Sequence, residues 1–162
     1  MKILAIDTAS ARCSAALWLD GRSLHRGVST ARDHARLLLP FVDELLREAR
    51  LSLAELDVIA FGRGPGSFTG LRVACSVAQG LALGAGLPVM PVSDLRALAA
   101  QAGRRLGPGQ AVDTVFACMD ARMGEVYWAE FPTRDGRPED REVIERVGAP
   151  DSVTRAGGVG TP

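Results

Sequence analysis

Lysine is almost absent from this 162-residue sequence, because Lys2 is the only one and arginine carries the rest of the positive charge. No lysine is therefore available beside the glycine-rich segment in the middle of the chain, where a Walker-type nucleotide loop would need one. Net charge is absent too, since 19 basic residues balance 19 acidic ones. A dedicated nucleic-acid binder needs a basic face to neutralise phosphates, so this balance argues against that class.

Cysteine pairs and long apolar runs are also scarce. The three cysteines, Cys13, Cys75 and Cys118, are an odd number and form no CxxC pair, which indicates a reducing cytoplasm. The apolar run at 3–6 is too short for a signal peptide, and we expect no stretch to reach the length of a membrane span. What is present is 47% hydrophobic residues, enough for one or two compact globular domains.

Strand and helix signals alternate through the first hundred residues in the order βββαβαβα. The expected strands cover 2–7, 14–19, 23–29, 57–61 and 88–92, and the expected helices cover 34–49, 68–85 and 94–102. We expect Asp33 to cap the first helix and Ser93 the third. The order is that of the ribonuclease H-like unit from which actin-like ATPases and sugar kinases are built.

The second half begins like the first. Residues 114–119 predict a strand ending at Asp120, followed by strands at 125–131 and 142–147 with a turn at Asp135-Gly136. This predicts an α/β fold of the actin-like (ASKHA) superfamily, with two copies of one unit. We expect a first domain at 1–102, a linker at 103–110 and a second domain at 111–162, the second copy being incomplete.

An aspartate ends the first strand of each copy, Asp7 in the first and Asp120 in the second. Together with Thr8, these two aspartates form a possible vestigial nucleotide site. An active ATPase of this superfamily would need glycine two positions after each, so that amides can close on phosphates. Asp7 is followed by Ala9, and Asp120 by Arg122. Each aspartate either holds a metal through water or forms a turn by accepting bonds from local amides.

The segment 61–72 is the most informative one in the chain. Its marked positions are Gly62, Gly64, Gly66, Ser67, Thr69 and Gly70. The Walker template fails for lack of lysine, and the dinucleotide template fails because Ser67 stands where glycine is required. Ser67 is either a helix cap or a nucleophile, and the loop either cradles phosphate or lets the following helix dock closely.

Two rows of small residues run along the helix at 68–85. The first is Gly70, Ala74, Ala78 and Ala82, and the second is Ser76, Gly80 and Gly84. We expect one row to pack on the sheet and the other, with Arg72, Gln79 and Leu83 beside it, to face a partner helix. The helix at 34–49 adds a wide apolar arc with Leu37, Leu38, Phe41 and Leu45. The two helices form either a helix-bundle interface or additional domain-domain packing.

These residues resemble the TsaB family, also called YeaZ. The resemblance is carried by 62–72, by the opening 3–8 and by the segment 119–129 with the letters MDARMGEVYWA, and it extends over residues 1 to about 131. TsaB is the bacterial accessory subunit of the system that makes threonylcarbamoyladenosine at position 37 of tRNAs. The resemblance implies an actin-like fold without transferase activity of its own, in a chain that contacts tRNA only through the complex.

The resemblance also implies partners. N-terminal helices would pair with the catalytic paralogue TsaD, the small ATPase TsaE would join, and the isolated chain would form homodimers. Where TsaD carries a His-x-x-x-His metal site, this chain has Asp94 and Leu98, so we expect no metal or cofactor of its own, with any ATP or ADP bound at the level of the complex. Family members continue past the point where this sequence stops. The alternative is an enzyme in its own right, a weak ATPase or a peptidase acting on the TsaD-type paralogue.

Overall fold

A computed structural model describes residues 1–30, 33–105 and 112–153 of the chain. The described residues divide into two compact units, with the division between Ser93 and Asp94. The element order confirms the expected βββαβαβα pattern through the third helix. Whether the two units are copies of one ancestral unit stays a prediction.

The first unit is built on a five-stranded sheet in the order β3-β2-β1-β4-β5. Its strands are β1 (Lys2–Asp7), β2 (Arg12–Leu19), β3 (Arg22–Ser29), β4 (Val58–Gly62) and β5 (Val89–Val92). The central strand β1 pairs antiparallel with β2 and parallel with β4. This arrangement brings the turn after β1 next to the loop that leaves β4, because parallel strands end at the same edge of a sheet.

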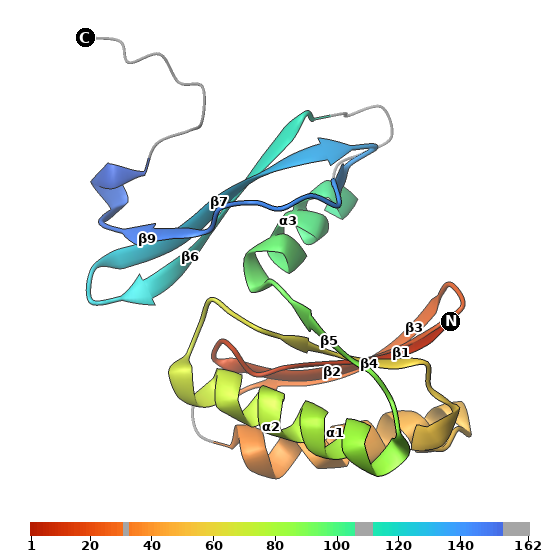
Figure 1. Cartoon of the computed structure of the whole chain (residues 1–162). Helices are drawn as coiled ribbons and strands as arrows, with labels where there is room; N and C mark the ends of the chain where they lie inside the picture. Colours follow the sequence, from red (N-terminus) through yellow and green to blue (C-terminus); the bar gives the residue numbers. More distant parts are fainter. Residues whose placement is uncertain (31–32, 106–111, 154–162) are drawn as a thin grey trace, which may run out of the picture. The chain divides into compact units, whose positions relative to one another are not determined.

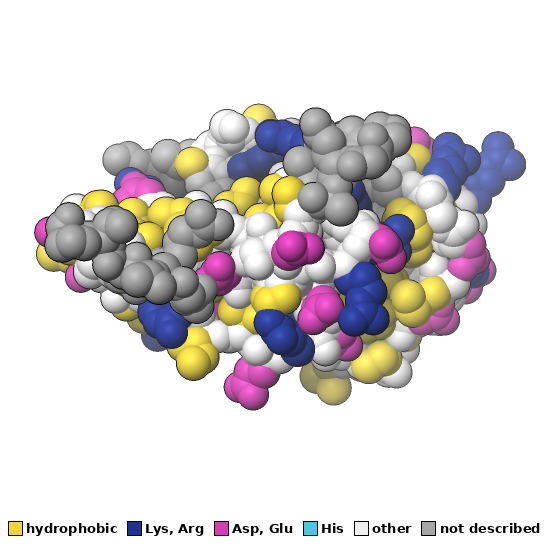
Figure 2. Space-filling model, turned by 90° about the horizontal axis from the view of Figure 1, so that it is seen from above, with side chains coloured by type: hydrophobic (Ala, Val, Ile, Leu, Met, Phe, Trp, Pro, Cys, Tyr) yellow, Lys and Arg dark blue, Asp and Glu magenta, His cyan; other side chains and the backbone are white. Residues whose placement is uncertain are grey.

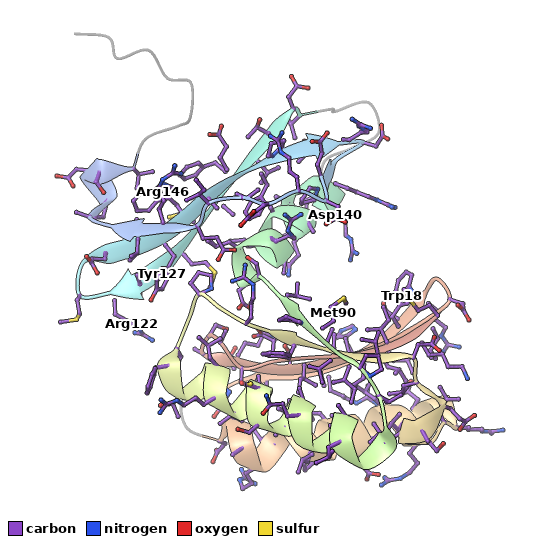
Figure 3. The ribbon with its side chains drawn as sticks, viewed as in Figure 1. Trp18, Met90, Arg122, Tyr127, Asp140 and Arg146 are labelled. Carbon is purple, nitrogen blue, oxygen red and sulfur yellow. The ribbon has the colours of Figure 1, made fainter. Side chains whose placement is uncertain are left out.

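Helices α1 (His34–Ala49) and α2 (Phe68–Ala85) cover one face of this sheet (Figure 1). The core under them is aliphatic, with Leu4, Leu17 and Ile59 fully buried between the sheet and the helices. Side chains alternate between the two faces of a strand, so neighbouring positions face the other way. Trp18 and Met90 lie on that opposite face (Figure 3), where both are partly exposed.

The start of α1 differs from the expected cap. Asp33 occupies the N-cap position, but its side chain makes no capping hydrogen bond. Its carboxylate pairs with the guanidinium of Arg36 at 3.5 Å, while its backbone carbonyl accepts the amide of Leu37. The carboxylate of Asp33 therefore pairs with Arg36 and does not accept a backbone amide, and the expectation that it caps the helix is wrong. The bounds of the helix are as expected.

Helix α2 corrects another expectation. It is long and apolar enough to cross a membrane by length and composition, so the expectation that no stretch reaches that length is wrong. A helix of small and apolar residues that packs on a sheet passes the same test, which makes a single such helix weak grounds for a membrane span.

The second unit contains α3 (Asp94–Arg105), β6 (Thr114–Arg122), β7 (Glu125–Arg134), β8 (Arg137–Pro138) and β9 (Arg146–Gly148). A short 3-10 turn, η2 (Pro150–Ser152), follows β9, and a similar turn, η1 (Leu53–Glu55), precedes β4 in the first unit. Leu95 and Ala99 of α3 pack with Ala129 and Phe131 of β7 in one buried cluster. By these contacts α3 belongs to the second unit.

The expected domain boundary after residue 102 therefore differs from the observed division at Ser93/Asp94. The expected linker also begins inside α3, at Gly103. A Cβ at Gly103 would overlap the backbone carbonyl of Gly136, so this glycine serves close packing of the helix on the β7–β8 turn. Most of the expected linker, 106–110, lies outside the described residues.

The expected strand at 142–147 is observed only as the three-residue β9. The guanidinium of Arg96 on α3 donates hydrogen bonds to the backbone carbonyls of Glu139 and Arg141. Val143 packs against the α3 cluster. The segment is thus tied to the helix, and ladder pairing begins at Arg146 opposite Trp128.

Candidate partner-binding face and glycine loop

The glycine loop joins β4 to α2 and lies against the turn that follows β1. A Cβ at Gly66 would lie 2.5 Å from the carbonyl oxygen of Ala9, and one at Gly70 would overlap the carbonyl oxygen of Thr8. Gly64 has a φ of +100°, a conformation that L side chains rarely adopt. The loop needs glycine because backbone meets backbone there.

Hydrogen bonds lock the same contact. The Ser67 amide donates to the Ala9 carbonyl at 2.6 Å, and the buried Thr8 hydroxyl donates to the Gly70 carbonyl at 2.6 Å. The Ser67 hydroxyl accepts the Gly70 amide at 3.3 Å, which confirms Ser67 as the cap of α2. The amides of Ser67 and Gly70 at the helix start are thereby used within the protein, which favours the docking interpretation over the phosphate cradle.

The remaining loop positions add little chemistry. Gly62 is buried at the end of β4, and Thr69 is exposed in the first turn of α2. His25, on β3, is exposed, and the partly buried His34 begins α1. No hydrogen bond joins either histidine side chain to Ser67 within the described part of the chain, so a Ser–His pair is not formed there.

Asp7 and Asp120 make the same local contact in the two units. The Asp7 carboxylate accepts the Ala9 amide at 3.2 Å, and the Asp120 carboxylate accepts the Arg122 amide at 2.8 Å. An amide two residues on would be needed for phosphate, and here the aspartate uses it. Both are turn formers of the kind expected for aspartate. Burial and, secondarily, the negative charge of Asp7 raise the pKa of the nearby Cys13 thiol.

Helix α2 presents two contrasting faces. Only Gly70, Ala74, Ala78 and Ala82 of its 18 residues are buried, so the first small-residue row is the one that packs on the sheet. The second row is exposed, and a Cβ built at Gly80 or Gly84 would meet nothing within 4 Å. Arg72, Ser76 and Gln79 are exposed beside it, and Leu83 is 87% exposed.

Helix α1 contributes less to this face than its sequence predicts. Leu38 and Leu45 are completely buried in the core, so their expected place at an interface is wrong. Leu37 and Phe41 are partly buried and pack against the same core. The apolar residue that α1 does expose is Leu39, at 49%.

Phe68 was not among the expected interface residues. It is 68% exposed at the start of α2, and the guanidinium of Arg72 lies over its ring at 3.8 Å from the ring centroid. The signal was present in the sequence, since residues four apart on a helix are neighbours and Arg pairs with aromatic faces. We call Leu39, Phe68, Arg72, Ser76, Gln79, Gly80 and Leu83 the α1/α2 face.

Potential metal ligands are scattered over the residues that the structure describes. They contain no group of three or more His, Cys, Asp or Glu side chains placed to hold a metal ion. Leu98 stands partly exposed on α3, one turn after Asp94, and its side chain offers no ligand atom. Over the visible face in Figure 2, basic and acidic side chains lie interspersed, in keeping with the balanced charge of the chain.

Comparison with known proteins identifies the family. Residues 27–151 match the family described as "TsaD: tRNA N6-adenosine threonylcarbamoyltransferase". The chain is 45% identical to the "tRNA threonylcarbamoyladenosine biosynthesis protein TsaB" of Escherichia coli and 46% identical to that of Haemophilus influenzae, each over 94% of this chain. It covers 64% and 66% of the lengths of these two relatives, which is just under two thirds.

A solved structure agrees with the sequence relatives. "YeaZ from Pseudomonas aeruginosa" superposes with a TM-score of 0.84 at 44% identity, over 95% of this chain and 70% of that one. The mixed α/β fold and the family therefore agree with the resemblance seen in the sequence. The chain belongs to the TsaB family, whose members are also called YeaZ.

Proposed function

We propose that this chain is a non-catalytic partner subunit for threonylcarbamoylation of adenosine 37 in tRNA. It binds a TsaD-type catalytic subunit through the α1/α2 face and works with a TsaE-type ATPase in the cytoplasm. It meets tRNA only through the complex, and in isolation it forms homodimers. The names of its relatives place them in this biosynthesis.

The observation that carries the proposal is the exposed row of α2. A helix apolar enough to cross a membrane exposes eight of its 18 residues, among them Leu83. The bare backbone at Gly80 and Gly84 allows another helix to approach closely, as small-residue rows do in packed helices. Together these features are more typical of a helix-bundle interface than of a surface that stays exposed to solvent.

The non-catalytic role rests on the turns after β1 and β6. Asp7 and Asp120 each accept a local amide, and the glycine loop fills the space beside the first turn. Leu98 supplies no ligand at the position that corresponds to the second histidine of the TsaD metal site. Nucleotide or metal binding by this chain alone would require these contacts to open.

The test is a binding measurement with a purified TsaD-type subunit. We expect Leu83→Glu and Arg72→Glu to weaken the complex at least about tenfold, because each places an unpaired charge in the centre of the face. Ile144→Glu is the matched control, since Ile144 is 69% exposed in the second unit and, as at Leu83, an exposed aliphatic side chain of the same size is replaced by a carboxylate. Complex formation that survives both substitutions in α2 contradicts the proposed interface.

The alternative, an enzyme in its own right, is tested separately. The isolated chain would turn over ATP, or cleave the TsaD-type paralogue, at a rate well above buffer. Asp7→Ala would abolish ATP turnover if Asp7 held the metal. Robust turnover that disappears in this variant would overturn the non-catalytic role while leaving the interface experiment unaffected.

A further inference from the structure

The tip of the β6–β7 hairpin has an unusual backbone. Arg122, Met123 and Gly124 have consecutive φ values of +70°, +53° and +78°. The left-handed region suits glycine and, to a lesser degree, asparagine and aspartate, while other side chains crowd their own backbone there. Two long side chains are thus held in a conformation that disfavours them.

Two other hairpins in the described part of the chain also have two-residue turns, and they show what such a turn ordinarily contains. The β2–β3 turn has Asp20-Gly21, and the β7–β8 turn has Asp135-Gly136, both with positive φ. Asp-Gly and Asn-Gly are the favoured pairs for two-residue turns of this kind. At the β6–β7 tip, Met123 takes the place of the aspartate, so turn formation does not explain the methionine.

The side chains of Arg122 and Met123 at this tip are exposed, and a hydrogen bond holds the backbone at Arg122. Met123 is 99% exposed, the highest value among the large exposed hydrophobic residues of the described chain. Arg122 is exposed beside it at the end of β6 (Figure 3). The Asp120 carboxylate holds the Arg122 amide, and the strand register shifts between these two residues. One exposed apolar residue is ordinary on a protein surface. One that is also kept in a disfavoured conformation points to function.

We propose that this tip is a docking point for a protein partner, in which Met123 enters an apolar pocket and Arg122 pairs with a carboxylate at its rim. The unbranched thioether side chain adapts to a narrow pocket, and the guanidinium matches a carboxylate in two-point geometry. Asp120 and Glu125 flank the tip, and these two carboxylates disfavour a nucleic-acid backbone as the occupant. The choice of partners for the test rests on the proposed function.

The experiment measures binding of the full chain to each purified subunit, TsaD-type and TsaE-type, by titration calorimetry. Met123→Asn removes the apolar side chain and installs the favoured Asn-Gly turn, so the Tm should stay equal or rise by up to about 3 °C. Binding to one subunit should weaken at least about tenfold, since the variant lacks the apolar side chain that the parent chain buries in the pocket of the partner. Met123→Leu should bind within about threefold of the parent chain. Asp135→Asn, the same kind of turn change in the next hairpin, should bind like the parent.

The outcomes separate this proposal from the proposed function. Parent-like binding of Met123→Asn to both subunits overturns the docking tip, whatever Leu83→Glu does. Weakened binding of Met123→Asn with unaffected Leu83→Glu supports the tip and contradicts the α1/α2 face. A parent chain that binds neither subunit overturns both.

Discussion

Replacing Gly70 by alanine tests whether the glycine loop serves docking of α2. Gly70 lies in the first turn of α2 with an ordinary helical backbone, so helix propensity alone would favour alanine by up to about 1 kcal/mol. The structure predicts the opposite sign, because the new Cβ would overlap the backbone carbonyl of Thr8. A backbone atom in a buried turn cannot swing aside as a flexible side chain can.

The magnitude follows from two costs. Forcing an extra carbon into a packed contact costs about 1–3 kcal/mol. Moving the helix start also breaks the buried bond from the Thr8 hydroxyl to the Gly70 carbonyl, which leaves a buried hydroxyl unpaired at a cost of about 1–3 kcal/mol. The two costs together are about 2–6 kcal/mol, so after subtraction of about 1 kcal/mol for helix propensity we expect Gly70→Ala to lower the free energy of unfolding by about 1–5 kcal/mol.

Gly80→Ala is the matched control in the same helix. A Cβ there meets nothing within 4 Å, so the substitution should raise the free energy of unfolding by about 0.5–1 kcal/mol. Urea unfolding followed by circular dichroism at 222 nm measures both variants, because α1 and α2 contain most of the helical residues in the described part of the chain. If Gly70→Ala were as stable as Gly80→Ala, the close contact with the β1 turn would be refuted.

Three further predictions use other contacts. Ser67→Ala removes the hydroxyl that accepts the Gly70 amide and should lower the free energy of unfolding by about 1 kcal/mol in the same urea assay; no change would mean that the cap contributes nothing. Cys118 is exposed whereas burial raises the pKa of the Cys13 thiol, so iodoacetamide should label Cys118 at least about tenfold faster at pH 7.5, and equal rates would contradict the burial. Hydrogen bonds from the Ser52 backbone amide and side chain lower the pKa of Glu55. The stabilisation by ionised Glu55 is therefore complete above the pKa of the unfolded state, and it is lost as the pH falls through the lower pKa of the folded state. Glu55→Gln should flatten the acid limb of a Tm-versus-pH curve between about pH 5 and 3, and an unchanged limb would contradict this role of Glu55.

The period of the small residues in α2 was a sufficient guide to its packing. A repeat every four residues places Gly70, Ala74, Ala78 and Ala82 on one stripe, and that stripe is the buried one. Glycine positions in the loop also indicated a tight contact. The partner atoms of that contact, on the turn after β1, required the strand order of the sheet and could not be read from local sequence.

The apolar arc of α1 shows where such reasoning stops. Leu37, Leu38 and Leu39 are equally apolar, yet one is buried, one is half-buried and one is exposed. Which of three adjacent leucines enters the core depends on the orientation of the helix on a twisted sheet. The amino-acid composition of the helix does not determine that orientation. The same holds for α3, whose sequence is amphipathic but does not say which sheet it covers.

The contacts that fill the space beside the β1 turn also fix the helix that carries the α1/α2 face. Ser67 and Gly70 tie the first turn of α2 to Ala9 and Thr8, so the helix cannot slide along the sheet without breaking buried hydrogen bonds. A face held in place before binding loses less conformational entropy when a partner docks on it. Under the proposed function, one set of backbone contacts therefore has two results. It closes the turn after β1, where an active ATPase of this superfamily would bind phosphate, and it holds the docking helix rigid. Opening the turn with Gly66→Ala should loosen α2 and weaken partner binding together, even though Gly66 lies outside the face itself.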